Sequence, residues 1–148
     1  MTPADVAYAA AVIDTMGRIT TRTVREAELP LLAVSCPNEP LLQWLGDLTG
    51  VRPFITKRSY SKHACAVHCP DPHQHIVSVS GRWSLSGAKA TVLLLNVRPY
   101  LRFQLEAAQQ AIDVGLSAGF KPATLEKMRA LGWEVDDALA RVRGVRAA

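Results

Sequence analysis

The sequence predicts an α+β fold with the order helix, strand, strand, helix, strand, strand, helix, helix and a tail. Two observations lead to this order. The β-prone segments come in two pairs, and segments with helical apolar spacing precede, separate and follow them. The chain has 148 residues, of which 49% are hydrophobic and 20% charged, as is typical of globular domains. We expect one main domain over residues 1–120 and a C-terminal helical extension with a basic tail over residues 121–148.

The first pair of strands follows an alanine-rich helix. Residues 5–15 carry almost no charge, which favours a helix packed on more than one side, and Gly17 ends it. Residues 18–25 are rich in β-branched side chains and predict a strand, with residues 28–36 as its hairpin partner after a short polar turn. The sequence thus begins as a helix followed by a hairpin.

The middle of the chain repeats this pattern. Asn38 can cap a helix that Gly50 ends, and its apolar residues at helical spacing are Leu41, Leu42, Leu45 and Leu48. Residues 54–62 and 75–85 are β-prone and predict a second hairpin. Helices are then expected over residues 88–97, about 100–117 and 122–131, with a break before Pro99.

Charge and composition limit the classes of function. Lys and Arg number 17 against 13 Asp and Glu, a net charge of +4 that is compatible with a polyanionic partner. No run approaches the roughly 20 apolar residues of a membrane span. The N-terminus lacks the basic start of a signal peptide, so we expect a cytoplasmic protein with no membrane partner. Three cysteines are an odd number, which argues against a disulfide framework.

Three segments together resemble the LAGLIDADG homing endonuclease family. Residues 9–17, Ala-Ala-Ala-Val-Ile-Asp-Thr-Met-Gly, resemble the nine-residue motif and stand in its place before the first hairpin. Residues 39–50 are similar to the family's middle helix, and residues 82–90 and 99–108 to its closing strand, helix and Pro-aromatic-Leu segment. The resemblance covers residues 5–117. It implies an αββαββα fold whose four-stranded antiparallel sheet forms a saddle over double-stranded DNA.

The alanines of the motif allow close helix packing. On composition alone they pack equally well on the protein's own sheet or against a second copy of the helix. Family members with one motif form homodimers through this helix, so the resemblance implies an interface made by Ala9, Ala10, Ala11 and Ile13.

Strand alternation predicts which residues face DNA. Ile19 is expected in the core, so Arg18, Thr20, Arg22 and Val24 share the other face. In the third strand Ile55 prefers burial, which favours Thr56, Arg58 and Tyr60, and Lys57 and Lys62 add charge at both parities. An ordinary solvated sheet face is the alternative. All nine residues are our candidate DNA contacts, because arginine on a β-ribbon can bind phosphates and guanine in the major groove.

The catalytic positions implied by the resemblance are degenerate. Met16 stands where the family has its metal-binding acid, and a thioether does not bind Mg²⁺. Asp14 matches a family residue that supports the end of the helix. It lies two residues before Met16, so its side chain is rotated by roughly 200° about the helix axis, and it could replace the acid only from that direction. Gln104 stands where the family has a lysine, although Arg102 is nearby in sequence. Mg²⁺ is therefore an expected cofactor only if nuclease activity remains.

Residues 63–75 contain all four histidines and two of the three cysteines. Cys65, Cys69, His73 and His75 could bind a structural Zn²⁺, with His68 as a substitute, or the segment could be a loop with two free thiols. Our first hypothesis is a homodimeric double-stranded DNA-binding protein with impaired or absent nuclease activity. The alternatives are an active Mg²⁺-dependent site-specific endonuclease and a zinc-stabilised interaction module.

Overall fold

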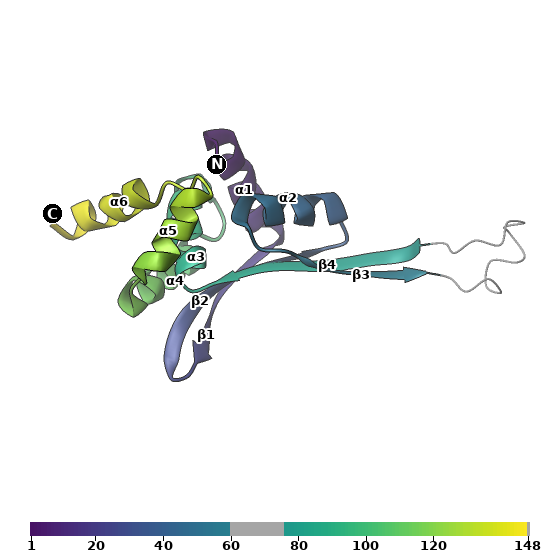
Figure 1. The fold of residues 1–148 in the computed structure, drawn as a ribbon, viewed down its shortest axis with the longest axis horizontal. Coiled ribbons are helices and arrows are strands. Elements are labelled where there is room, and N and C mark those ends of the chain that lie inside the picture. The colour runs from purple at the N-terminus through teal and green to yellow at the C-terminus, as the bar shows by residue number, and fades with distance from the viewer. Residues whose placement is uncertain (60–75, 148) are drawn as a thin grey trace, which may run out of the picture.

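The computed structural model describes residues 1–59 and 76–147. Figure 1 shows the arrangement of its helices and strands. The elements in chain order are α1 (Pro3–Met16), β1 (Gly17–Val24), β2 (Ala27–Cys36), α2 (Glu39–Thr49), β3 (Phe54–Ser59), β4 (Ile76–Ser86), α3 (Ala88–Val97), the 3₁₀ turn η1 (Arg98–Tyr100), α4 (Leu105–Ala118), α5 (Pro122–Ala130) and α6 (Val135–Ala147). This confirms the predicted α+β class and the two strand pairs.

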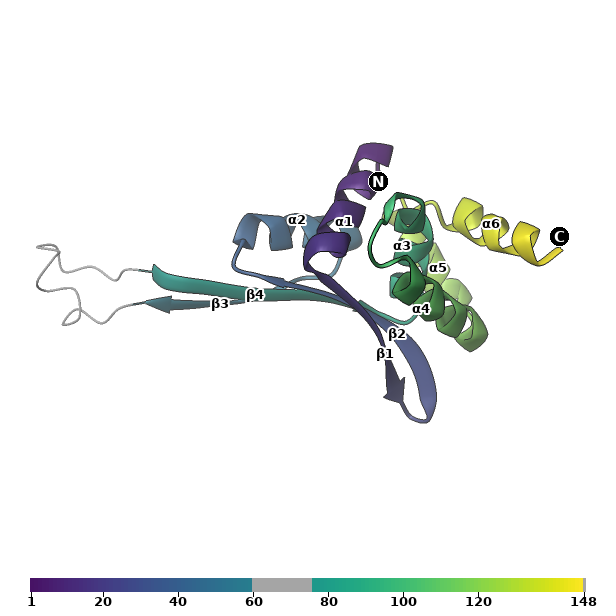
Figure 2. The same cartoon turned by 180° about the vertical axis from the view of Figure 1, so that it is seen from behind.

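The four strands form one antiparallel sheet in the order β1-β2-β4-β3. The helices lie on one side of this sheet, and the β1–β2 hairpin bends away from α1 and α2 while α4 packs along it (Figures 1 and 2). Among the described residues, the other side carries no helix, as a half-exposed antiparallel sheet allows. The sheet is therefore free to offer one whole face to a partner.

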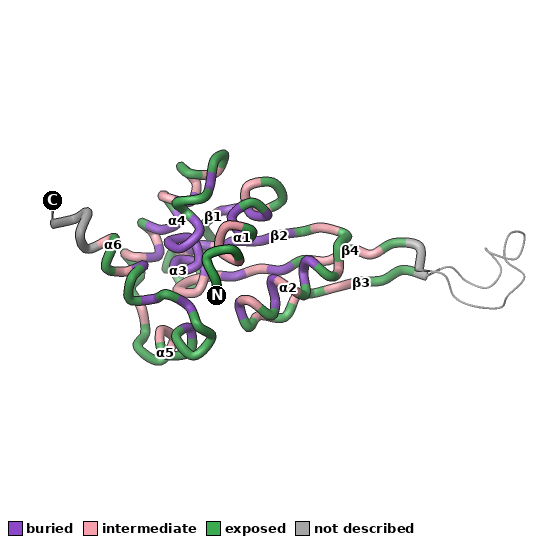
Figure 3. The backbone as a smooth tube through the Cα atoms, turned by 90° about the horizontal axis from the view of Figure 1, so that it is seen from above, coloured by how far each residue is buried: buried purple, intermediate pink, exposed green. Residues whose placement is uncertain are grey.

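The core lies between the sheet and the helices (Figure 3). Leu32 on β2 and Trp83 on β4 are fully buried on the helix side of the sheet. The Trp83 indole Nε1–H donates to the hydroxyl of Thr49 at the end of α2, 3.1 Å away, and that hydroxyl donates to the carbonyl of Leu45. The buried polar groups of this α2–β4 contact are thus satisfied, as the dry interior of a protein requires.

The C-terminal segment packs on the same core. Met128 and Trp133 are buried, and the Trp133 indole donates to the carbonyl of Leu48 at 3.3 Å. Leu131, which follows the last residue of α5, is 40% exposed. In the part of the chain that the structure describes, no helix is long and apolar enough to cross a membrane.

One helix begins later than predicted. We expected a helix from about residue 100, but α4 begins at Leu105. Residues 102–104 instead bring three successive main-chain N–H groups to the carboxylate of Asp14 on α1. This long-range contact gives those N–H groups an acceptor outside the helix, which local sequence patterns do not reveal.

Candidate nucleic-acid interface

The register of the strands separates the two faces of the sheet. Ile19, Leu32 and Trp83 point toward the helices. The side chains of opposite parity form what we call the open face. Its described members are Arg18, Thr20, Arg22 and Val24 on β1; Ala27, Leu29, Leu31, Ala33 and Ser35 on β2; Phe54, Thr56 and Arg58 on β3; and Ser78, Ser80, Arg82, Ser84 and Ser86 on β4.

The charge of the open face has one sign. Arg18, Arg22, Arg58 and Arg82 are all exposed there, and none of its described members is acidic. Ala33, Ser35 and Ser84 lie between Arg18 and Arg82 and are short enough for a partner to approach the backbone, whereas Leu29 lies opposite Arg22. The open face is therefore a cationic surface with short side chains near its centre.

Six of the nine candidate DNA contacts lie on the open face: Arg18, Thr20, Arg22, Val24, Thr56 and Arg58. Lys57 does not. Its parity places it on the helix side, where its ammonium group forms an ion pair of 2.7 Å with Glu39 at the start of α2. Tyr60 and Lys62 lie outside the described residues.

Phe54 and Arg82 are among the members of the open face that were not predicted from the sequence. Both could have been found by alternation, because Arg82 is out of phase with the buried Trp83 and Phe54 is in phase with Thr56. These two residues line an open hollow of ≈ 450 Å³ with Arg22, Leu31, Val51, Arg52 and Ser84. The guanidinium of Arg22 donates to the hydroxyl of Ser86 at 3.1 Å, which orients it on this surface.

The end of α1 is fixed to the start of α4 by two side chains. The Asp14 carboxylate accepts hydrogen bonds from the main-chain N–H groups of Arg102, Phe103 and Gln104, the last two at 3.2 and 3.1 Å. In return, the side-chain amide of Gln104 donates to the carbonyls of Ile13 at 2.6 Å and Gly17 at 3.0 Å. Both side chains therefore serve the junction between the two helices.

The three degenerate catalytic residues do not fit a divalent cation. Both Asp14 carboxylate oxygens already accept N–H groups, Met16 offers only a thioether, and Gln104 presents its amide nitrogen to main-chain oxygens. Mg²⁺ requires near-octahedral oxygen ligands. Within residues 1–59 and 76–147, no group of three or more His, Cys, Asp or Glu side chains is placed to hold an ion.

The proposed zinc ligands cannot be compared with this geometry. Cys65, His68, Cys69, His73 and His75 all lie outside the described residues.

Most of the interface predicted on α1 is covered by the chain itself. Ala9, Ala10 and Ile13 are completely buried in the core, so they have no surface left for a partner. Ala11 is exposed. The exposed side of α1 is formed by Ala4, Tyr8, Ala11 and Thr15, which follow helical spacing. The Thr15 hydroxyl donates to the carbonyl of Ala11 at 2.8 Å, so this stripe presents little unsatisfied polarity.

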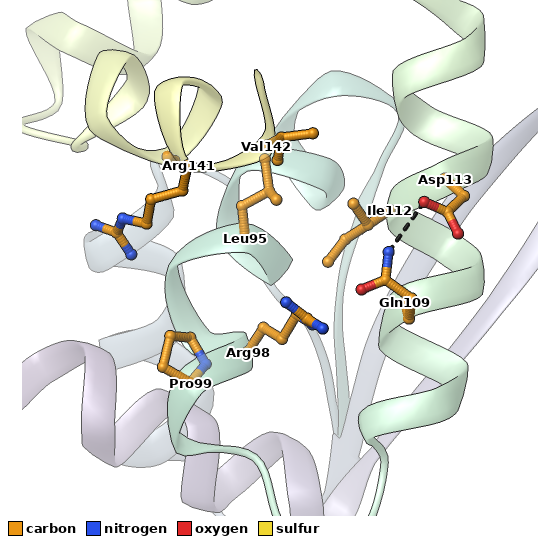
Figure 4. Close-up of a pocket in the computed structure, with 9 residues that line it drawn as sticks. Leu95, Arg98, Pro99, Gln109, Ile112, Asp113, Arg141 and Val142 are labelled. Carbon is orange, nitrogen blue, oxygen red and sulfur yellow. Dashed lines mark hydrogen bonds between the residues drawn. The ribbon is translucent and has the colours of Figure 1, made fainter. Parts of the chain in front are cut away.

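A second hollow lies away from the sheet, between α3, α4 and α6 (Figure 4). Its volume is ≈ 330 Å³ and its apolar wall includes Leu95 and Ile112. Its rim carries Arg98 and Arg141 but also Asp113, which accepts a hydrogen bond from Gln109 at 2.9 Å. The mixed charge distinguishes it from the open face.

The fold and the helix junction define the class of protein to which this structure is similar: the chain has the LAGLIDADG homing endonuclease fold, as the resemblance in sequence implied. Two solved structures of the homing endonuclease I-CvuI match with a TM-score of 0.50 and 17% sequence identity. One is in complex with the I-CreI target in the presence of Mg, with DNA not cleaved, and the match covers 87% of this chain and 95% of that chain. The other is in complex with its own target in the presence of Ca, with coverage of 90% and 98%. No family model and no curated protein matches the sequence.

Proposed function

We propose that this protein is a homodimeric double-stranded DNA-binding protein that does not cleave its DNA. The observation that carries the proposal is the open face, whose four arginines stand on a curved sheet with no described acidic neighbour on that face. The fold supports the same reading, because the similar I-CvuI structures are complexes with target DNA.

The shape of the open face suits the major groove of a duplex. The groove, about 12 Å wide, admits a two-stranded β-ribbon, and arginine can bind either phosphate oxygens or the O6 and N7 atoms of guanine. Thr20, Thr56 and the serines of β4 add hydroxyl donors and acceptors between the arginines. Each hairpin would then follow the groove, with the bend of β1–β2 matching the curvature of the duplex (Figure 1).

The dimer contact in this proposal is the exposed stripe of α1. Ala11 and Thr15 are small and lie one turn apart, so two copies of the helix can approach closely. Ala9, Ala10 and Ile13 would support the interface from beneath by holding α1 on its own core. Dimerisation would bring two open faces into line along one duplex.

The absence of cleavage follows from the chemistry of the motif. A phosphodiester nuclease of this type needs carboxylate oxygens that are free to hold a divalent cation. Both carboxylate oxygens of Asp14 accept hydrogen bonds at the α1–α4 junction, and the thioether of Met16 cannot act as an oxygen ligand in their place. The proposal therefore does not include Mg²⁺. An active endonuclease that holds Mg²⁺ through Asp14 is the competing function.

The binding test measures affinity for a selected duplex as a function of salt. Phosphate contacts make log K fall with log salt by about 0.9 per contact. If Arg58 binds phosphate, Arg58→Ala removes two phosphate contacts from a dimer and reduces the magnitude of the slope of log K against log salt by about 2. In a monomer it removes one contact and reduces that magnitude by about 1. Lys127→Ala removes an exposed charge on α5, away from the sheet, and is the matched control. A salt-independent affinity would refute the DNA-binding proposal.

The cleavage test incubates supercoiled DNA containing the selected site with the protein and Mg²⁺ or Mn²⁺. We expect no nicking. Site-specific nicking that Asp14→Ala abolishes, in a variant that still binds the duplex, would establish the endonuclease instead.

Light scattering on the free protein and on Ala11→Arg tests the dimer, because the arginine would place two like charges at the contact.

A further inference from the structure

Phe54 is a large apolar side chain with no covering partner in the described structure. It is the first residue of β3, it belongs to the open face, and 74% of its surface is exposed. The hollow around it is lined by Arg22, Arg52 and Arg82, so its immediate surroundings are cationic. A phenyl ring offers no donor to a phosphate, and its burial against an apolar group of a partner is favourable.

Arg82 is the direct neighbour of Phe54 across the β3–β4 pair. Directly opposed residues on one face of an antiparallel pair have Cβ atoms about 4.5–5.5 Å apart. Arg82 is exposed, and no other described residue accepts a hydrogen bond from its guanidinium or forms an ion pair with it. It contrasts with Arg22, which is held by Ser86. An apolar ring and a guanidinium are therefore presented side by side.

The major groove offers one partner for each of these groups. The apolar feature among its standard base edges is the C5 methyl group of thymine, and the best acceptor pair for arginine is O6 and N7 of guanine. Stacked base pairs are about 3.4 Å apart, so neighbouring side chains about 5 Å apart reach the same or adjacent base pairs.

We propose that Phe54 and Arg82 are specificity-determining residues that read a thymine and an adjacent guanine in each half of the DNA site. This inference rests on the proposed function. It adds which bases of the DNA site the protein recognises. Phe54 contacts the thymine methyl, and Arg82 donates two hydrogen bonds to the guanine. The other arginines of the open face supply contacts that do not depend on sequence.

The first experiment selects duplexes from a random library with the full-length protein and with Phe54→Ala and Arg82→Ala. The wild-type protein should enrich a thymine next to a guanine in each half-site. Phe54→Ala should lose the thymine preference alone, and Arg82→Ala the guanine preference alone. Lys127→Ala should keep both. Both tested side chains are exposed, so circular dichroism should show unchanged folding.

The second experiment changes single atoms of the selected duplex. Uracil in place of the thymine removes only the methyl group and should weaken wild-type binding about fourfold. Phe54→Ala should not distinguish thymine from uracil, whereas Phe54→Leu should. 7-Deazaguanine removes N7 and should weaken wild-type binding by about five- to a hundredfold, with little effect on Arg82→Ala. Inosine keeps O6 and N7 and is the control base.

The outcomes separate this inference from the proposed function. If the wild-type protein binds duplex DNA but treats thymine and uracil alike, or guanine and 7-deazaguanine alike, the reading of bases by Phe54 and Arg82 is wrong while DNA binding stands. If Arg82→Ala changes only the salt slope, Arg82 binds phosphate. If no duplex is bound with salt dependence, the proposed function itself fails.

Discussion

Asp14 and Gln104 bind each other's segments across the junction of α1 and α4. The Asp14 carboxylate accepts the main-chain N–H groups of residues 102–104, and the Gln104 amide donates to the carbonyls of Ile13 in α1 and of Gly17 at the start of β1. Asp14 thus supplies an acceptor for main-chain N–H groups at the start of α4 that have no partner within the helix. Asp14, the carboxylate that could have replaced the missing metal-binding acid, and Gln104, which stands at the family's lysine position, both make structural contacts in this chain.

Asp14→Ala should lower the free energy of unfolding by about 2–3 kcal/mol. The substitution leaves three main-chain N–H groups without their acceptor, and hydrogen bonds to a charged group are stronger than neutral ones. Urea unfolding of both proteins measures the difference. Asp14→Asn keeps one acceptor oxygen and should recover part of the loss. An unchanged midpoint would show that water satisfies this junction equally well.

Thr49→Val should lower the free energy of unfolding by about 1–3 kcal/mol, although valine has the same shape. The buried Trp83 indole N–H donates to the Thr49 hydroxyl at 3.1 Å and would lose its acceptor. Thr49→Ser keeps the hydroxyl and is the matched control. Chemical denaturation followed by tryptophan fluorescence measures both variants. A valine variant as stable as the wild-type protein would show that this hydrogen bond does not stabilise the fold.

Gly115→Ala should destabilise the protein, although alanine favours helices by about 1 kcal/mol over glycine. A Cβ atom at Gly115 would lie 1.9 Å from the Thr91 hydroxyl oxygen, which is too close for any side chain. We expect a net loss of about 1–3 kcal/mol. Thermal unfolding of Gly115→Ala, Thr91→Ala and the double variant checks the cause. The double variant should recover much of the loss, and simple additivity would exclude this contact as the origin.

The stability contributed by Asp5 should disappear in acid. Hydrogen bonds from the Thr2 main-chain N–H and then from its hydroxyl lower the pKa of Asp5 below 3.8. A carboxylate with a lowered pKa in the folded state stabilises the protein above its unfolded pKa. That stability is lost as the pH falls through the folded value.

The melting temperatures of wild-type protein and Asp5→Ala should therefore differ at pH 7 and converge as the pH falls through the lowered pKa of Asp5. Thermal scans over pH 2–7 measure this. Asp136 also has a lowered pKa, caused by its hydrogen bond with Arg129, and Asp136→Ala is a useful comparison on α6. A gap that persists at low pH would mean that the Asp5 side chain acts through helix propensity alone.

Local patterns were enough to predict the elements and the polarity of the sheet. Ile19 identified the buried parity of β1, and the same parity places Arg18 and Arg22 on the open face. The helical spacing of Leu41, Leu42 and Leu45 predicted the buried side of α2. The position of Lys57 was not predicted, because its charge does not reveal that Glu39 lies on the helix side of the sheet and forms an ion pair with it.

By itself the sequence determined the α+β class, the order of the elements and the alternation along each strand, because these depend on neighbours within a few residues. Only the tertiary structure decided that Asp14 meets Gln104 and that Phe54 stands opposite Arg82. Both pairs join segments far apart in the chain. Their meeting is set by strand register and helix packing, which a linear pattern of residues does not specify.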